Sequence, residues 1–317
     1  MFKRNKDKDT LVLPNVKRMS DAELYGQFVE EVWTQYSVKD RLRLLQEVEN
    51  RRAKIDGRPP VAVIGAPNDP TSLGMYAEGK VLGVPVKVIF INALFLEDGS
   101  GKLDFHTGIK ALETILHEGR HANQHYIMDH HPDRVAAQVL HEWLSSRARY
   151  FPSEEPLKGD LEGKDLIFYC LQSIEMDARR FARRQLIKIH NLLAERGKDT
   201  RQIAAAIQEC RQQEVELIDC VQKYLTLDDV REAERIVCDA MKISHPEIDT
   251  SKLRLFENAR MILRLPRPKT DLDYDDIIDR LDRIADAKMN RLSDAEIARI
   301  AEGRDRILDN SRRFDRI

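Results

Sequence analysis

The sequence contains few cysteines, and no two of them form a Cys-x-x-Cys pair. The 317 residues include only Cys170, Cys210, Cys220 and Cys238. Because the chain shows no secretory signal, we expect these cysteines to be reduced thiols, buried as small apolar groups. The cytoplasm is therefore the expected compartment, and secretion by a signal-independent route stays open.

Long apolar runs and a strong net charge are also missing. No run approaches the roughly 18–20 apolar residues that span a bilayer, and the longest, Val84 to Leu96, is interrupted by Lys87 and Asn92. The basic N-terminus is not followed by the apolar core of a signal peptide. The formal net charge is only -2 although 33% of the residues are charged. We expect a soluble protein with no membrane partner, and a nucleic-acid partner is disfavoured.

The hydrophobic pattern divides the chain into three segments, and together they predict an α+β fold. Residues 1–58 predict an N-terminal arm and helices, with Ser20 and Glu23 spaced as a capping box at a helix start. Residues 59–196 contain β-type runs followed by helices, and residues 197–317 are almost entirely helical in pattern. We expect a small core of short strands packed on helices, with helical extensions on both sides.

Within the middle segment, the period of the apolar residues predicts individual elements. Short strands are expected at Val61–Ile64 and Met75–Ala77, and the clearest strand runs from Val84 to Phe95. Helical spacing runs from about Thr107 to His130, and one long helix is expected from Asp165 to Arg196.

The helix predicted near the centre of the chain contains His117-Glu118-Gly119-Arg120-His121, which is the pattern His-Glu-x-x-His. Residues four apart share a helical face, so His117 and His121 can present their imidazoles to one metal ion. Two imidazoles, a carboxylate and a water suit zinc, and Glu118 can take a proton from that water. Gly119 costs roughly 1 kcal/mol against Ala inside a helix, which indicates a close contact at that turn.

A second motif lies further along the chain and gives the sequence a family resemblance. Glu175 begins a Glu-x-x-Ala-x-x-Phe-Ala pattern that resembles the second helix of the gluzincin metallopeptidases, most closely the small ImmA/IrrE-type and toxin-associated enzymes. The resemblance implies that Glu175 is the carboxylate ligand and that Ala178, Phe181 and Ala182 pack the two helices together.

The resemblance extends over about residues 60–190 and includes the strand before the first motif. Val86 to Leu94, with Asn92 near its end, resembles the edge strand on which these enzymes bind an extended peptide. The resemblance implies a zincin-like core, a zinc cofactor and a protein or peptide substrate.

One position departs from the family pattern. Many gluzincins have Asp just after the Ala, where it orients a zinc-bound histidine, but this chain has Arg179, which cannot accept a hydrogen bond. Asp177, Asn123 or a backbone carbonyl could replace it. His125, one turn after His121, is an alternative third ligand.

The sequence leaves the group that stabilises the oxyanion unassigned. The candidates are Tyr126, Tyr150, Tyr169 and His190.

The motifs together predict a zinc endopeptidase with Glu118 as general base. Two alternatives stay open: a catalytically degenerate zinc-binding protein that acts as a helical interaction or regulatory module, and a nucleic-acid-binding helical region. The second would use the basic cluster of Arg179, Arg180, Arg183 and Arg184. The sequence does not determine the oligomeric state.

Overall fold

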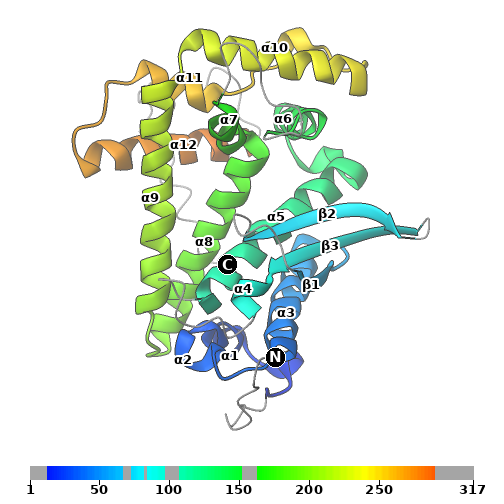
Figure 1. Cartoon of the computed structure of the whole chain (residues 1–317), viewed down its shortest axis with the longest axis vertical. Coiled ribbons are helices and arrows are strands. Elements are labelled where there is room, and N and C mark those ends of the chain that lie inside the picture. The colour runs from blue at the N-terminus through cyan, green and yellow to red at the C-terminus, as the bar shows by residue number, and fades with distance from the viewer. Residues whose placement is uncertain (1–12, 67–72, 82–83, 97–106, 152–162, 290–317) are drawn as a thin grey trace, which may run out of the picture. The chain divides into compact units, whose positions relative to one another are not determined.

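The computed structural model describes residues 13–66, 73–81, 84–96, 107–151 and 163–289 (Figure 1). The contacts within the chain define two compact units. Unit 1 comprises residues 1–126 and 178–212, and unit 2 comprises residues 127–177 and 213–317. This grouping differs from the three segments predicted from the sequence, because it joins the N-terminal helices to the strands in one unit.

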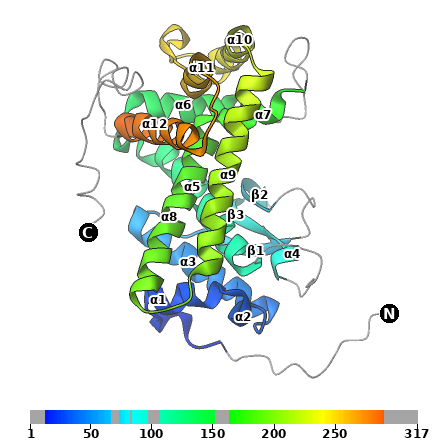
Figure 2. The ribbon, with the colours of Figure 1, turned by 90° about the vertical axis from the view of Figure 1, so that its left-hand side faces the viewer.

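Unit 1 contains the sheet, a set of short N-terminal helices and parts of three long helices. Its elements are η1 (Val16–Arg18), α1 (Asp21–Tyr25), η2 (Gly26–Phe28), α2 (Glu30–Trp33), α3 (Val38–Asp56), β1 (Ala62–Ala66), β2 (Gly74–Val81), β3 (Val84–Asn92), α4 (Ala93–Leu96), most of α5 (Thr107–His130), α8 (Ser173–Glu195) from Ala178 onward, and α9 (Arg201–Tyr224) as far as Gln212. Within this unit the parts of α8 and α9 lie side by side and are joined by a short turn (Figures 1 and 2).

The first helix begins where the sequence predicts it. The hydroxyl of Ser20 accepts from the backbone N–H of Glu23, and the Glu23 carboxylate accepts from the N–H of Ser20, so the predicted capping box is confirmed. Helix α3 is capped by Ser37 and ends at Gly57, whose φ of 67° places it in the left-handed region that glycine tolerates.

The sheet has the strand order β1-β3-β2, with β1 parallel and β2 antiparallel to β3. Its central strand is therefore β3, and the expectation that Val86 to Leu94 forms an edge strand is wrong. Val88 pairs with Ala62 on one side and with Ala77 on the other, so both edges of β3 are occupied. The outer strand on the antiparallel side is β2. The strand also ends earlier than predicted, at Asn92, where α4 begins.

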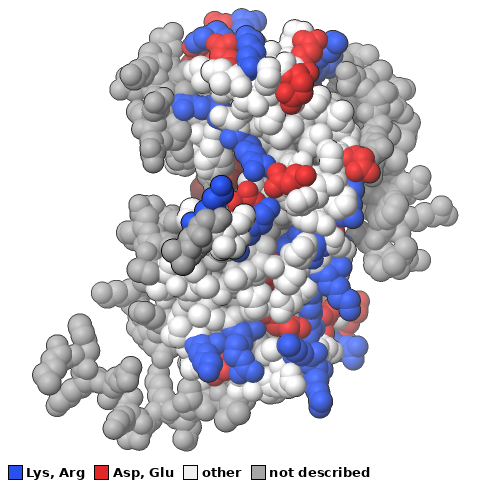
Figure 3. Space-filling model, turned by 90° about the vertical axis from the view of Figure 1, so that its right-hand side faces the viewer, with Lys and Arg blue, Asp and Glu red and all other residues white. Residues whose placement is uncertain are grey.

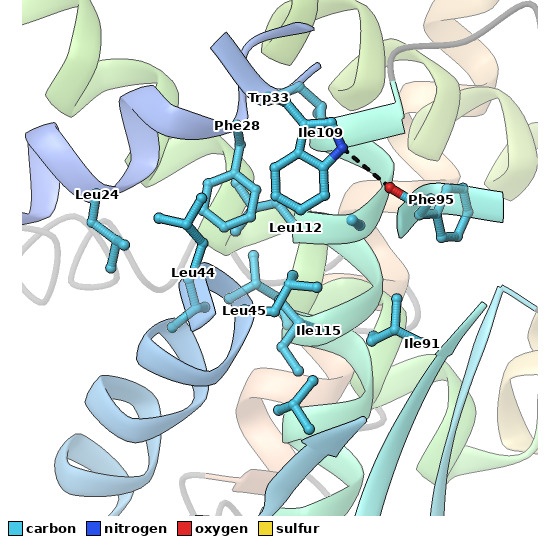
Figure 4. Packing of buried hydrophobic residues seen from close by; sticks show 14 of the residues in the cluster. Leu24, Phe28, Trp33, Leu44, Leu45, Ile91, Phe95, Ile109, Leu112 and Ile115 are labelled. Atoms are coloured by element: carbon cyan, nitrogen blue, oxygen red, sulfur yellow. Dashed lines mark hydrogen bonds between the residues drawn. The ribbon is translucent and has the colours of Figure 1, made fainter. Parts of the chain in front are cut away.

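One face of the sheet packs against α3 and α5 to form the core of unit 1. Figure 4 shows apolar side chains from the N-terminal helices converging with those of α5 and β3. Trp33 is fully buried, stacks on Phe28 at a centroid distance of 5.3 Å, and donates from Nε1 to the carbonyl oxygen of Phe95 at 3.2 Å. Ile91 and Ile115 are each at most 1% exposed. This core fixes the position of α5 against the sheet.

Every regular element in the described residues of unit 2 is a helix. Its elements are the end of α5, η3 (Pro132–Arg134), α6 (Ala137–Ala148), α7 (Asp165–Leu171), the start of α8, the end of α9, α10 (Leu227–Ser244), η5 (Thr250–Lys252), α11 (Glu257–Arg264) and α12 (Asp271–Met289). Phe151, Phe168 and Phe256 form an aromatic cluster with centroid distances between 5.4 and 6.4 Å. These rings anchor a second apolar core that α10 and α11 share.

The long helix predicted from Asp165 to Arg196 is interrupted at Gln172. This residue has an extended ψ of 134° and separates α7 from α8. Its side chain, which is buried, accepts from the N–H of Phe151 at 3.2 Å and donates to the carbonyl oxygen of Arg149 at 2.9 Å. The break is therefore held by contacts from a distant segment, and it places Glu175 in the first turn of α8.

The architecture confirms the predicted α+β class, a small three-stranded mixed sheet within a mainly helical protein. All four cysteines are free thiols, and Cys210 is the most buried of them. Among the described residues, no helix has both the length and the apolar character that crossing a membrane requires.

Candidate metal centre

Helix α5 carries the first motif and presents its two histidines on one face. Nε2 of His117 lies 3.0 Å from Nε2 of His121, and the two rings meet edge to face at a centroid distance of 4.7 Å. His121 is only 9% exposed. The predicted pairing of the two imidazoles across one helical turn is therefore present in the structure.

Glu175 completes a group of three possible metal ligands with these histidines. One ligand atom from each of His117, His121 and Glu175 lies within 4.8 Å of the others, and Glu175 is 1% exposed. The three residues can hold a metal ion. Ligand atoms around tetrahedral zinc lie roughly 3.3–3.5 Å apart, so side-chain movements on the order of 1 Å suffice, and the donor set fits zinc.

Gln124, which was not among the residues predicted to orient a histidine, supports His121. Oε1 of Gln124 lies 2.8 Å from Nδ1 of His121, and Gln124 is fully buried. Asn123, one of the candidates for this role, is 5% exposed, and its Oδ1 has no hydrogen-bond partner among the described residues. The signal was present in the sequence, because Gln124 follows His121 by three positions and therefore lies on the same helical face.

Tyr150, one of the candidate tyrosines, contacts Glu175, the third possible metal ligand. Its hydroxyl donates to Oε1 of Glu175 at 2.8 Å, and its ring meets that of Tyr169 at 5.5 Å. Burial, followed by the neighbouring Glu175 carboxylate, raises the pKa of Tyr150 far above its ordinary value. The phenol therefore remains a hydrogen-bond donor over the working pH range. His190 instead contacts Thr200 at 3.1 Å.

Glu118 is bound to the outer strand of the sheet. Its Oε2 accepts from the backbone N–H of Tyr76, in β2, at 2.7 Å, and the residue is 8% exposed. This contact identifies β2 as the strand next to the candidate general base. The resemblance had implied β3 as the edge strand that binds a peptide.

The expected close contact at Gly119 is present. A Cβ atom at this position would lie 3.2 Å from Oε2 of Glu49. Glu49 forms a bidentate ion pair with Arg58, at 2.6 and 2.9 Å, and both side chains are almost fully buried. Arg58 also donates to the carbonyl oxygen of Gly119 at 3.1 Å. A buried ion pair thus touches the helical turn between the two histidines.

His125 is not part of the ligand cluster in the structure. Its Nδ1 lies 3.5 Å from Oε2 of Glu78, and its ring meets that of Tyr76 at 5.1 Å. Glu78 also bonds to Lys87, on β3, at 2.7 Å. His125 therefore connects α5 to the hairpin of β2 and β3, and the geometry favours Glu175 as the third ligand.

The basic cluster on α8 does not form a free cationic surface. Arg179, Arg180, Arg183 and Arg184 are all partly buried, and each interacts with other residues. On the face shown in Figure 3, acidic side chains are interspersed with basic ones. The partial burial of the four arginines does not favour a nucleic-acid interface on α8.

No protein-family model, curated protein or solved structure matches the chain. The resemblance to the gluzincins therefore depends on the two helical motifs, and the geometry of the three ligands is the structural observation consistent with it.

Proposed function

We propose that this chain is a zinc-dependent endopeptidase of the gluzincin type that acts in the cytoplasm on a protein or peptide. The observation that supports this proposal most is the cluster of His117, His121 and Glu175, which comes from two separate helices. Glu118 follows the first ligand directly, as a general base for hydrolysis requires. A helix that held a structural metal would not need a carboxylate at that position.

Each residue of the site has a role in the proposed reaction. When bound, zinc would polarise the scissile carbonyl and lower the pKa of an attacking water to about 7. Glu118 takes the proton of that water on a carboxylate oxygen and passes it to the leaving nitrogen. Gln124 and Tyr150 hold the ligands His121 and Glu175 in place through the contacts described above.

The sheet offers a place for the substrate backbone. In the described sheet β2 has a partner on one side only, and Tyr76 directs its N–H away from β3. An extended peptide could add to this edge as a further strand, with backbone hydrogen bonds that demand little of the side chains. We propose β2, in place of β3, as the substrate-binding strand.

The proposal is tested by metal analysis together with a hydrolysis assay. Protein purified without chelators should contain about one zinc per chain, and His117→Ala and Glu175→Ala should lose most of it. Incubation with a mixture of peptides, followed by mass spectrometry, should reveal cleavage products. Glu118→Gln should retain zinc and the fold but lose at least about 10²-fold in rate.

Two results would count against this function. Wild-type zinc content in Glu175→Ala would remove Glu175 from the ligand set. Cleavage by Glu118→Gln at the wild-type rate would exclude Glu118 as the base.

A zinc-binding protein without catalytic activity is the second candidate. Arg179 supports it, because the acidic residue that orients a ligand in many gluzincins is replaced by a cation. In that case the zinc-loaded wild type would cleave no peptide, and His117→Ala would lower thermal stability without any change in activity. The contact between Gln124 and His121 weakens this candidate, since a substitute for the lost acceptor is present.

A further inference from the structure

Gln124 lies where it can decide which nitrogen of His121 carries the proton. Its carbonyl oxygen, Oε1, is 2.8 Å from Nδ1 of His121. A carbonyl oxygen only accepts, so this contact is a hydrogen bond only when Nδ1 carries the proton; the other tautomer would place two lone pairs against each other. Gln124 is fully buried, so water does not compete for the contact.

The opposite nitrogen of His121 points to the ligand cluster. Nε2 of His121 is 3.0 Å from Nε2 of His117. A neutral imidazole with its proton on Nδ1 has a lone pair on Nε2, and a metal ion needs that lone pair. The hydrogen bond to Gln124 therefore also leaves Nε2 of His121 able to bind a metal ion.

We propose that Gln124 is a positioning residue for the metal centre, holding His121 in the Nδ1–H tautomer with Nε2 free to coordinate. The inference rests on the proposed metal site but does not require peptide hydrolysis. Gln124 thus orients a histidine of the cluster by accepting a hydrogen bond, which Arg179 cannot do. Its amide is neutral, so the support adds no negative charge beside the ligands.

The tautomer can be measured without metal. In metal-free protein with ¹⁵N-labelled histidine, the imidazole nitrogen shifts should show the proton of His121 on Nδ1. Gln124→Met keeps the length of the side chain and removes the acceptor, so the Nδ1–H form should lose its preference. Gln124→Glu keeps an acceptor oxygen and should retain that form. A wild-type His121 with its proton on Nε2 would overturn the proposal, even if Gln124→Met failed to fold.

Metal affinity provides the second readout, by competition with a chromophoric zinc chelator. Gln124→Met should bind zinc 10–100-fold more weakly than the wild type, the range found when such supporting contacts are lost. Gln124→Glu should stay closer to the wild type than Gln124→Met does. The matched control is Asn123→Leu, a buried neighbour on the same helix, which should leave the affinity unchanged.

The outcomes separate this inference from the proposed function. Unchanged zinc affinity and an unchanged tautomer in Gln124→Met would overturn the inference while the metal site stands. A wild type that binds no zinc but shows the Nδ1–H tautomer would overturn the zinc peptidase and support Gln124 as the residue that orients His121.

Discussion

The backbone N–H of Tyr76 donates a hydrogen bond of 2.7 Å to Oε2 of Glu118. The candidate general base is thus held by the same strand edge that we propose for the substrate. A peptide that added to β2 at Tyr76 would need this N–H as a donor. Substrate binding and the contact of Glu118 with β2 are therefore expected to compete, and binding would release the carboxylate toward the attacking water.

The competition predicts that Glu118→Ala binds peptide more tightly than Glu118→Gln. The alanine variant frees the N–H of Tyr76, whereas the glutamine side chain can still accept from it. A hydrogen bond contributes about 0.5–1.5 kcal/mol net, so the difference in Kd should be roughly 2–10-fold. Calorimetry with an uncleaved peptide and the zinc-loaded variants measures it. Equal Kd values would show that the peptide does not use this N–H.

A second prediction concerns the glycine between the histidines. Gly119→Ala should lower the free energy of unfolding by about 1 kcal/mol, although alanine is the better helix former by a similar amount. The added Cβ would press on Glu49 at 3.2 Å, and Glu49 is fixed by its buried ion pair with Arg58. Gly26→Ala is the matched control, because nothing lies within 4 Å of a Cβ there. Urea unfolding of both variants measures the change in the free energy of unfolding. A Gly119→Ala protein more stable than the wild type would show that the Glu49 side chain moves away from the added Cβ.

The parts of the site that the sequence predicted are those that depend on local periodicity. His117, Glu118 and His121 share a face because the helix repeats every 3.6 residues, and an unbroken α5 confirms that helix. Gln124 could have been found by the same rule. The family pattern instead places the supporting acceptor on the second helix, at the position of Arg179.

The parts that the sequence could not provide depend on contacts between distant segments. The apolar run of β3 is compatible with a central or an edge strand, since periodicity says nothing about pairing partners. The break at Gln172 is fixed by the backbone of Arg149 and Phe151, and helical propensity continues through it. Tyr150 precedes Glu175 by 25 positions, so its contact with the ligand could be proposed only as one of several options.

Glu78 provides a prediction about pH. Burial opposes ionisation of its carboxylate, but hydrogen bonds from Lys87 and Tyr76 outweigh it and lower the pKa of Glu78 from 4.5 to about 2. Because the folded-state pKa is depressed, the contribution to stability is complete above pH 4.5 and is lost as the pH falls toward 2. The side chain is partly exposed, so we expect only about 1 kcal/mol at pH 7.

The measurement compares wild type with Glu78→Gln by urea unfolding at several pH values. The difference in free energy of unfolding between the two proteins should be largest near pH 7, should shrink below pH 4.5 and should close only as the pH approaches 2. Lys87→Met should reduce the pH-dependent stabilisation by Glu78, because Lys87 forms a salt bridge with Glu78 at 2.7 Å. A difference that stays constant from pH 7 to pH 3 would contradict the assignment.

In unit 2, replacement of the buried Lys288 is expected to cause a large loss of stability. Nζ of Lys288 lies 2.7 Å from both Glu142 and Glu257, and the Lys288 side chain is 8% exposed. Lys288→Met would leave two carboxylates without their shared cation, at a cost of about 3–5 kcal/mol at pH 7. Burial raises the pKa of Glu142, so this cost should fall as the pH is lowered and that carboxyl takes up a proton. Lys242→Met, at an exposed ion pair, should change stability by less than about 1 kcal/mol.

The last prediction concerns Tyr150, whose hydroxyl donates to Oε1 of Glu175 at 2.8 Å. Tyr150→Phe removes only the hydroxyl, and the ring can keep its contact with Tyr169. Without the donor, Glu175 is less firmly oriented, so zinc affinity should fall about 10-fold. Tyr274→Phe is the control, because it removes a similar bond to the carboxylate of Asp219, outside the cluster. If Tyr150→Phe retained wild-type affinity but lost hydrolysis, the hydroxyl would act on the substrate oxyanion instead.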